Sequence, residues 1–220
     1  MSYEAEDTKQ KLIEAAREQL YKKGISNTTL EKITKQAFVQ PSAVSYYFGG
    51  KRGLVENVIE GFYDRIYHKV SEITDVEEMK SILWIYVLWH NISHDHNIAK
   101  CMMEFLSMDV TAAEVEPTMR FCEFVDMTRR AFGLPEEDEN RFDDPYYYFL
   151  LNNHTLYGMM KYALRSTQDP ASTALLLART DMNIKAVIAG VKDLDIIREK
   201  CLVAEKILEQ SEVRDLTILF

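Results

Sequence analysis

Apolar residues recur every three or four positions along most of the 220-residue chain, the spacing that places side chains on one face of an α-helix. Leu12, Ile13, Ala16 and Leu20 form the first such stripe, and Gly24 follows it as a residue suited to ending a helix. No segment alternates apolar and polar residues with the two-residue period of a half-buried strand. The pattern predicts an all-α protein of about nine or ten helices.

Two short helices joined by a tight turn are expected after this first helix. Thr28 and Glu31 have the spacing of a capping box, which predicts the start of the first short helix. Pro41 suits the first turn of the second, where a missing N–H is tolerated. The second helix offers only Val44 and Phe48 to a core, which favours a recognition helix in a DNA major groove. A helical hairpin packed in a core, with chance tyrosines, is the alternative.

Small hydrogen-bonding residues and tyrosines cover the outward side of this second helix. Small side chains allow close approach to base edges, and longer ones reach the flanking phosphates. The candidate DNA-binding residues are Thr28, Thr29, Gln40, Pro41, Ser42, Ala43, Ser45, Tyr46, Tyr47 and Lys51.

The first quarter of the chain resembles the DNA-binding domain of TetR-family transcriptional regulators. The matching residues are Thr8, Ile13, Ala15, Ala16, Leu20, Gly24, Thr28, Thr29, Ile33, Ala37, Val39, Tyr47, Phe48, Lys51 and Leu54. Phe38 departs from the pattern, standing where the family usually has a turn glycine, and Ser45 stands where it usually has an aromatic residue.

This resemblance implies a three-helix helix-turn-helix domain followed by a helical bundle that binds a small-molecule effector and dimerises. It implies a ligand-responsive regulator, by default a repressor, that binds a near-palindromic double-stranded operator as a homodimer and is released by its effector. A different class is the alternative: a helical ligand-binding protein, or a small enzyme, whose helix-turn-helix no longer binds DNA.

The net charge of −9 is unevenly distributed along the chain. Residues 1–55 carry nine Lys or Arg against six Asp or Glu, a net +3, whereas residues 56–220 carry 17 against 29, a net −12. A basic N-terminal region on an acidic remainder is compatible with phosphate contact at that region alone. Because the basic excess is small, we expect DNA binding to require a dimer.

An apolar residue recurs every four positions from Leu54 to Val70 and predicts one long helix over residues 51–73. We therefore expect a DNA-binding domain over 1–50, a connecting helix over 51–73, and an effector-binding and dimerisation domain over 74–220.

Helices expected near 146–165 and 171–189 are apolar on more than one face. We expect them to form a two-fold interface, a four-helix bundle between two copies of the chain. Burial of both inside a monomer core is the alternative, because periodicity does not separate the two cases.

From Asp75 onward the chain becomes rich in aromatic and methionine side chains, which would suit an apolar or aromatic effector. For each of them, ordinary core packing is the alternative. The candidate pocket residues are Trp84, Tyr86, Trp89, Met102, Met103, Phe105, Phe121, Phe124, Met127 and Tyr157.

His90, His94 and His96 form a weaker candidate for a metal site, since imidazoles suit zinc, copper or nickel. They stand where a helix break is expected and where polar residues collect for other reasons, so no metal is assigned. We also expect no cofactor and no enzymatic activity, because the chain has no phosphate-binding glycine loop, nucleophile elbow or HExxH motif. Three scattered cysteines, a polar N-terminus and the lack of a long apolar run favour a cytoplasmic protein without membrane contact.

Overall fold

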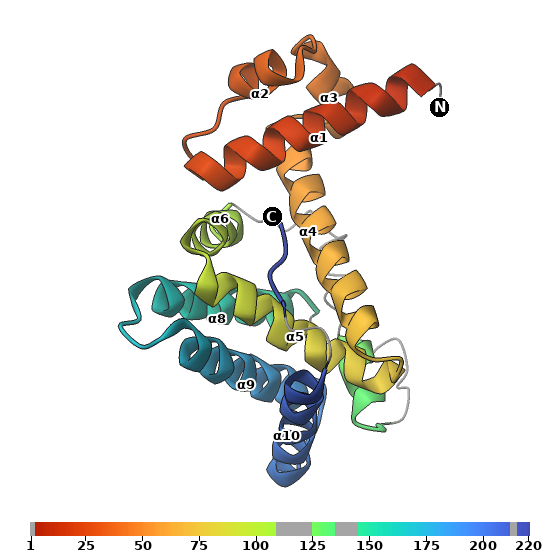
Figure 1. The fold of residues 1–220 in the computed structure, drawn as a ribbon, viewed down its shortest axis with the longest axis vertical. Helices are drawn as coiled ribbons and strands as arrows, with labels where there is room; N and C mark the ends of the chain where they lie inside the picture. The colour runs from red at the N-terminus through yellow and green to blue at the C-terminus, as the bar shows by residue number, and fades with distance from the viewer. Residues whose placement is uncertain (1–2, 109–124, 135–144, 212–214) are drawn as a thin grey trace.

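Every regular element that the computed structural model describes is a helix, so the expected all-α fold is confirmed (Figure 1). The structure describes residues 3–108, 125–134, 145–211 and 215–220. The sequence also predicts a surface loop over 133–145, from its Gly, Pro and charged residues, and a helix from about residue 112; most of both lies outside these ranges. Within them, no helix is both long enough and apolar enough to cross a membrane.

Three helices form one end of the molecule, here called the head, and a fourth leads away from it. These helices are α1 (Tyr3–Lys23), α2 (Leu30–Ala37), α3 (Ser42–Phe48) and α4 (Lys51–Ile73). The connecting helix is therefore present over the expected residues. At the standard rise its 23 residues span about 35 Å.

The remaining helices form the body, which lies below the head in Figure 1. They are α5 (Glu77–His94), α6 (His96–Leu106), residues 125–131, α8 (Pro145–Arg165), α9 (Pro170–Ile188) and α10 (Leu194–Gln210). α9 packs mainly against α5, α8 packs against α6, and α10 lies on α9 and α5. Asp95 separates α5 from α6 at the expected break and caps α6, accepting from the amide of Asn97 at 2.8 Å.

One face of α4 is buried along its whole length. Leu54, Val58, Phe62, Ile66 and Val70, four residues apart, are all at most 1% exposed. The helix packs on α1 and α3 in the head and on α5 in the body. Because each such side chain stabilises the fold by roughly 1.5–3 kcal/mol on burial, this stripe joins the two parts firmly.

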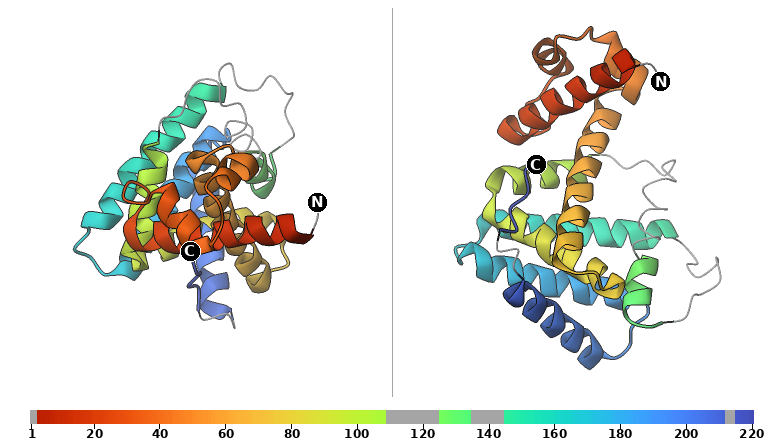
Figure 2. Two further views of the ribbon diagram at one scale, coloured as in Figure 1. Left: turned by 90° about the horizontal axis from the view of Figure 1, so that it is seen from above. Right: turned by 45° about the vertical axis from the view of Figure 1, so that its right-hand side comes forward.

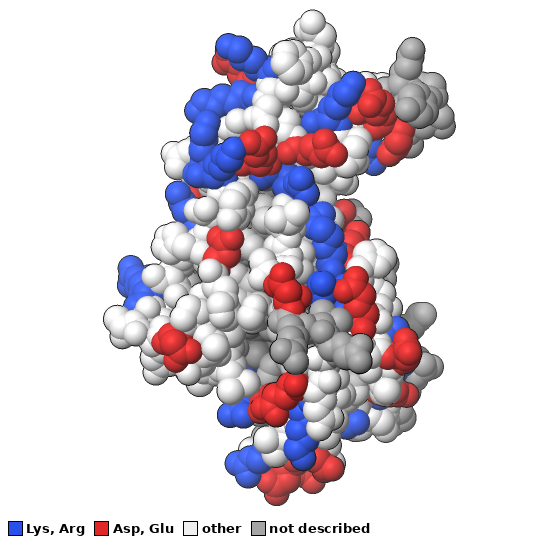
Figure 3. Space-filling model, in the orientation of Figure 1, with Lys and Arg blue, Asp and Glu red and all other residues white. Residues whose placement is uncertain are grey.

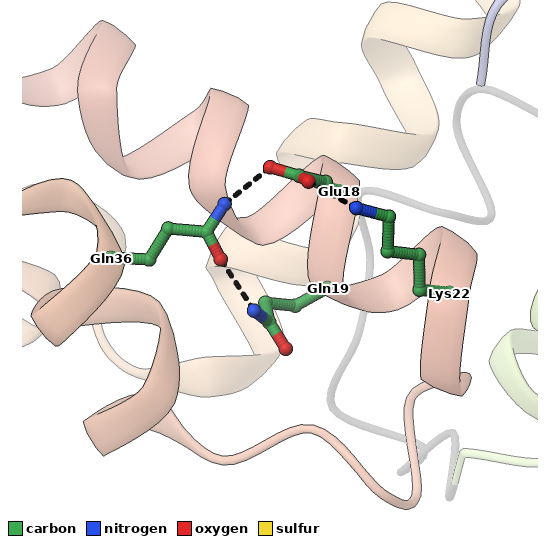
Figure 4. Close-up of polar contacts among 4 residues, drawn as sticks. All are labelled: Glu18, Gln19, Lys22 and Gln36. Carbon is green, nitrogen blue, oxygen red and sulfur yellow. Dashed lines mark hydrogen bonds and ion pairs between the residues drawn. The ribbon is translucent and has the colours of Figure 1, made fainter.

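A polar network sets α2 against α1 (Figure 4). Gln36 of α2 donates a hydrogen bond to Glu18 and accepts one from Gln19, while Lys22 donates to Glu18. The ammonium of Lys22 also lowers the pKa of the Glu18 carboxyl below its usual value. A single glutamine thus ties the first short helix to two successive residues of α1.

The cap of α2 differs from the expected one. Thr29, not Thr28, is the N-cap, and its side chain accepts from the amide of Lys32 at 3.4 Å. Thr28 is buried, and its hydroxyl donates to the Gly24 carbonyl at 2.7 Å. The predicted capping box at Thr28 and Glu31 is therefore wrong, because Thr28 instead closes the turn that ends α1.

The backbone of α3 ends very close to α4. A Cβ built on Gly53 would lie 2.0 Å from the carbonyl oxygen of Phe48, far inside van der Waals contact. A glycine at this position therefore allows α3 to pack tightly on α4.

We predict that Gly53→Ala destabilises the protein by at least about 2 kcal/mol, because the new methyl group forces the backbone of the head to move. The matched control is Gly158→Ala, a helical position where a Cβ meets nothing within 4 Å. There helix propensity predicts a gain of up to about 1 kcal/mol. Chemical unfolding followed by circular dichroism measures both, and a Gly53→Ala protein as stable as the wild type would contradict the close approach.

Candidate functional site

The outward side of α3 is exposed as the sequence predicted. Gln40, Pro41, Ser42 and Ser45 are exposed, while Val44 points into the core. Tyr46 is 82% exposed, which is unusual for so large a side chain in a folded head. The helix therefore presents small polar groups with one long aromatic side chain beside them.

Tyr47 is held in place by its neighbours. Its ring lies edge-on to Tyr46, with centroids 4.9 Å apart, and 6.4 Å from the ring of Phe48. Tyr47 is half-buried and packs against the core of the head. Tyr46 is thus the freer of the two hydroxyls, and Tyr47 supports it.

Two of the candidate DNA-binding residues serve the head itself. Thr28 is 1% exposed, so the expected DNA contact does not fit its position. The ammonium of Lys51 donates to the Ile25 carbonyl at 2.7 Å and ties the start of α4 to the loop after α1. Thr29 is exposed at the start of α2.

Two lysines that sequence reasoning passed over lie on the exposed side of α2. Lys32 and Lys35 both face solvent on the helix that precedes the recognition helix. Figure 3 shows several Lys and Arg side chains over the head, with acidic side chains among them and both signs of charge over the body. The available signal was a pair of basic residues three apart on the polar side of a short amphipathic helix.

The turn between α2 and α3 is kept although glycine is missing from it. Phe38 has φ 55° and ψ 40°, the left-handed conformation, and its side chain is 96% exposed. A residue with a Cβ in this conformation costs roughly 1–2 kcal/mol. Phe38, where the family usually has glycine, therefore strains the backbone locally, but the turn keeps its conformation.

Residues 12–58, which span α1 to the first part of α4, match the family described as bacterial regulatory proteins, tetR family. The head of this chain is therefore similar to the DNA-binding domain of TetR-family regulators. The probable HTH-type transcriptional regulator YttP of Bacillus subtilis is 33% identical over 109 residues, which cover 47% of this chain and 51% of that protein. TtgR of Pseudomonas putida is 34% identical over 74 residues, covering 33% and 35%. The chain thus spans about half the length of YttP and about a third of TtgR.

Two solved structures share the fold beyond the head. A TetR transcriptional regulator from Rhodococcus sp. RHA1 superposes with a TM-score of 0.60 at 15% identity, covering 82% of this chain and 97% of that one. RolR, solved in complex with resorcinol, superposes with a TM-score of 0.58 at 15% identity, covering 94% and 97%. At such identity the likeness establishes the architecture, a helix-turn-helix head on a helical body.

A buried polar cluster lies in the body where α5 meets α9. Trp89 is fully buried, and its indole N–H donates to Asp181 Oδ2 at 2.9 Å. The other carboxylate oxygen of Asp181 accepts from Lys185, which is also buried. Sequence reasoning missed this pair, although two opposite charges four residues apart on a largely apolar helix are a usable signal.

Trp84 also stands on α5 and reaches the same region through its contact with Tyr63 of α4. Its ring lies 5.3 Å from that of Tyr63, and its indole N–H donates to the Tyr63 carbonyl at 3.4 Å. Burial, together with the Asp181 carboxylate, raises the pKa of the Tyr63 hydroxyl above its usual value. Both tryptophans expected in the pocket therefore border one region, where α4, α5 and α9 meet.

The other pocket candidates are not gathered there into one group. Met102 is buried on α6, and Met103 and Phe105 are partly buried against the core. Tyr157 lies on the exposed side of α8. Tyr86 is buried and donates to Glu205, while Met127 is half-buried. Phe121 and Phe124 lie outside the described residues.

The candidate histidines do not assemble a metal site. His90 and His94 stack with ring centroids 4.0 Å apart, and Nδ1 of His94 lies 2.8 Å from the His90 carbonyl oxygen. Burial, reinforced by His94, lowers the pKa of His90 to about 4, so its imidazole is neutral near pH 7. His96 is exposed, and among the described residues no three metal-ligating side chains converge.

The helices expected at a dimer interface have one buried and one exposed side. On α9, Leu177 and Met182 are buried, whereas Leu176 and Val187 are 46% and 57% exposed. On α8, large apolar side chains are likewise exposed, at Leu151, Tyr157 and Tyr162. Each helix therefore buries one side within the chain and leaves apolar side chains exposed on the other, so the expectation of a dimer interface stays a prediction.

The end of α1 is held by both ends of α6. Tyr21 donates to Asp95 Oδ2 at 2.6 Å, and the amide of Ser26 donates to Glu104 Oε2 at 2.9 Å. The Glu104 carboxylate lies so close to Gly24 that a Cβ there would be 2.8 Å from it. The head is thus joined to the body by α6 as well as by α4, a link that sequence reasoning did not find.

We predict that Phe38→Gly raises the free energy of unfolding by about 1 kcal/mol, because glycine adopts positive φ without the Cβ penalty. Phe38→Ala is the control: it removes the exposed ring but keeps the Cβ, so its stability stays near that of the wild type. Thermal unfolding compares the three proteins. If Ala and Gly stabilise equally, exposure of the ring and not backbone strain is the cause.

A second prediction concerns α10, which is fastened to α9 by a bidentate pair. Arg179 donates to the two oxygens of Glu205 at 2.7 and 2.6 Å and lowers the pKa of that carboxyl from 4.5. Because the folded-state pKa is the lower one, the stabilisation is complete above about pH 4.5 and is lost as the pH falls through the folded value.

Glu205→Gln is therefore expected to lower the free energy of unfolding by about 1 kcal/mol at pH 7, with the gap to wild type narrowing toward pH 3. Glu209→Gln, an exposed position on the same helix, is the control and should change little. Urea unfolding at several pH values gives the comparison. A gap independent of pH would contradict the role of the Glu205 charge.

Proposed function

We propose that this protein is a ligand-responsive transcriptional regulator, by default a repressor, that binds a near-palindromic operator as a homodimer. The observation that carries the proposal is the outward side of α3, where small polar residues and Tyr46 are exposed on a TetR-type head. An α-helix fits the major groove, and residues near its start are those that meet base edges.

The proposed DNA contacts fall into two groups according to side-chain length. Ser42, Ala43 and Ser45 are short and would lie against base edges, where they influence which sequence is preferred. Tyr46 would reach a phosphate, with Tyr47 supporting it through their edge-on contact. Gln40, Pro41 and Thr29 flank this surface. Thr28 and Lys51 keep the head in shape, and Lys32 and Lys35 supply the positive charge on the neighbouring helix.

Dimerisation is proposed through α8 and α9. These helices pack against each other and each leaves apolar side chains exposed. Two copies related by a two-fold axis would bury those side chains in a four-helix bundle. A dimer would also place two recognition helices on the same DNA, which compensates for the modest charge of a single head.

The effector is proposed to bind in the body near the region bordered by Trp84, Trp89 and Tyr63. Aromatic rings there would favour a small apolar or aromatic molecule, and Asp181 is the polar group within reach. RolR, which shares the fold, was solved with resorcinol, a small aromatic diol. Effector binding lowers operator affinity only if the bound molecule favours another position of the heads, which α4 and α6 would transmit.

The proposal is tested by DNA binding of the full chain to the DNA upstream of its own gene, measured by fluorescence anisotropy at two salt concentrations. We expect Tyr46→Ala to weaken binding to every duplex by about five- to tenfold, since one phosphate contact is lost. Lys35→Ala should weaken it too and reduce the slope of log affinity against log salt by about one. Ser42→Ala should instead change the ranking of operator variants.

Tyr67→Ala is the matched control, because it also removes an exposed tyrosine but lies on α4, outside the head. Its affinity should equal that of the wild type. If the wild-type chain binds no duplex even at low salt, the regulator proposal fails and a helical ligand-binding protein takes its place. If Tyr46→Ala and Ser42→Ala both bind normally, α3 is not the recognition helix.

A further inference from the structure

The C-terminal segment, residues 215–220, lies between the head and the body. After α10, at the far end of the body, the described chain is seen again close to α4, and it ends beside α1 (Figures 1 and 2). It contains no helix, yet Ile218 and Phe220 are 6% and 5% exposed. Two apolar side chains of a segment without regular structure are thus buried as well as those of the core helices, while Leu219 between them is exposed.

A buried asparagine on α5 binds the backbone of this segment. Asn91 is 2% exposed; its side-chain nitrogen donates to the Leu216 carbonyl at 2.9 Å, and its oxygen accepts from the Ile218 amide at 2.7 Å. The same nitrogen also donates to Val87 within α5 at 2.8 Å. Without the segment, the side-chain oxygen of Asn91 loses its hydrogen bond from the Ile218 amide, which costs about 1–3 kcal/mol while the oxygen stays buried. The asparagine therefore fits this segment specifically.

The connecting helix holds the other side of the segment. Arg65 of α4 donates from Nε to the Leu219 carbonyl at 2.9 Å. The ring of Phe220 lies 5.3 Å from the ring of Phe62, one of the fully buried residues of the α4 stripe. Aromatic pairs at this distance are favourable beyond the area that they bury. The segment is thus fixed to α4 and α5 together, close to the point where they approach the head.

Phe220 also touches the head directly. Its ring stacks on Tyr21 of α1, with centroids 6.3 Å apart and planes 29° from parallel. The hydroxyl of Tyr21 donates to Asp95, the residue that caps α6. Tyr21 is therefore held on one side by the C-terminal segment and at its tip by the body.

We propose that residues 215–220 are an intramolecular strut that sets the position of the head on the body, with Phe220 as the positioning residue against which Tyr21 rests. The head is then connected to the body in three places: by the strut, by α4 and by the contacts of α6 with α1. A head joined by α4 alone could tilt through bending of that helix. A head that is also held at Tyr21 cannot tilt without separating the rings of Tyr21 and Phe220. Only the effect on operator affinity rests on the function proposed above.

The strut is tested by hydrogen exchange of three full-length variants and one variant lacking residues 215–220. Loss of the segment, or Phe220→Ala, should speed exchange of the Ser26 amide and of the last turn of α1 by at least about fivefold, while amides of α9 stay unchanged. Phe220→Leu should restore most of the protection. Leu219→Ala is the matched control, because its side chain is 77% exposed and its carbonyl bond to Arg65 survives.

Adding the segment back as a separate peptide distinguishes a positioning role from a general contribution to stability. A synthetic peptide of residues 215–220, supplied to the shortened chain at about 1 mM to match the effective concentration of a tethered segment, should restore protection at Ser26. The same peptide with Phe220→Ala should not. Unchanged exchange at Ser26 in the shortened chain, or equal rescue by both peptides, overturns the proposal. If the shortened chain does not fold, Phe220→Ala in the full chain decides the question.

Operator binding supplies the functional arm. Without effector, the variants that lack the strut should bind the operator at least about fivefold more weakly than the wild type. Their heads would adopt the DNA-binding orientation for a smaller fraction of the time. Unchanged or tighter binding, together with faster exchange at Ser26, overturns the inference that this orientation is the DNA-binding one. If the wild type binds no duplex, the regulator proposal fails while the exchange result still decides the strut.

Discussion

The burial of one continuous face of α4 is the constraint on which the rest of the structure depends. The same stripe, from Leu54 to Val70, is covered by head helices at one end and by α5 at the other. A helix buried in this way cannot turn about its axis without exposing several large apolar side chains, each costing roughly 1.5–3 kcal/mol. Rotation is therefore suppressed, and the motion left to the head is a tilt. The contacts at Tyr21 and Ser26 act on that tilt.

Polar groups in the interior then specify how the apolar surfaces meet. Apolar packing alone tolerates sliding of one helix along another, whereas Trp89 with Asp181 fixes the level at which α5 meets α9. Asn91 fixes the C-terminal segment in the same way through backbone hydrogen bonds. Each of these groups would be costly to leave unpaired, so neighbouring arrangements are penalised strongly.

Much of the fold was predictable because it depends on local periodicity and local signals. The range of α4, the break at Asp95 and the exposed face of α3 all follow from apolar spacing and helix-capping chemistry. The capping role was misassigned by one residue, since Thr28 and Thr29 are chemically alike and only the packed turn distinguishes them. The hydrogen bond from Lys51 was not predictable for a related reason: its partner, the carbonyl of Ile25, is 26 residues away in the chain.

The remaining features were not predictable because they join residues that are distant in sequence. Glu104 meets Ser26, and Asn91 meets Ile218, across 78 and 127 positions. Periodicity also says which faces are apolar without saying what covers them. The candidate pocket residues therefore divided among a buried core, the α6 surface and the outer side of α8 once the helices were packed.

The placement of Trp84 and Trp89 has a consequence for observing the protein. They are the only two tryptophans of the chain, and both stand on α5, one beside Tyr63 and the other hydrogen-bonded to Asp181. The head contains none, so intrinsic indole emission is a signal from the body alone. A change in that emission when a duplex is added would therefore report a structural change that extends from the head to the body. The two tryptophans thus serve as intrinsic probes of communication between the two parts.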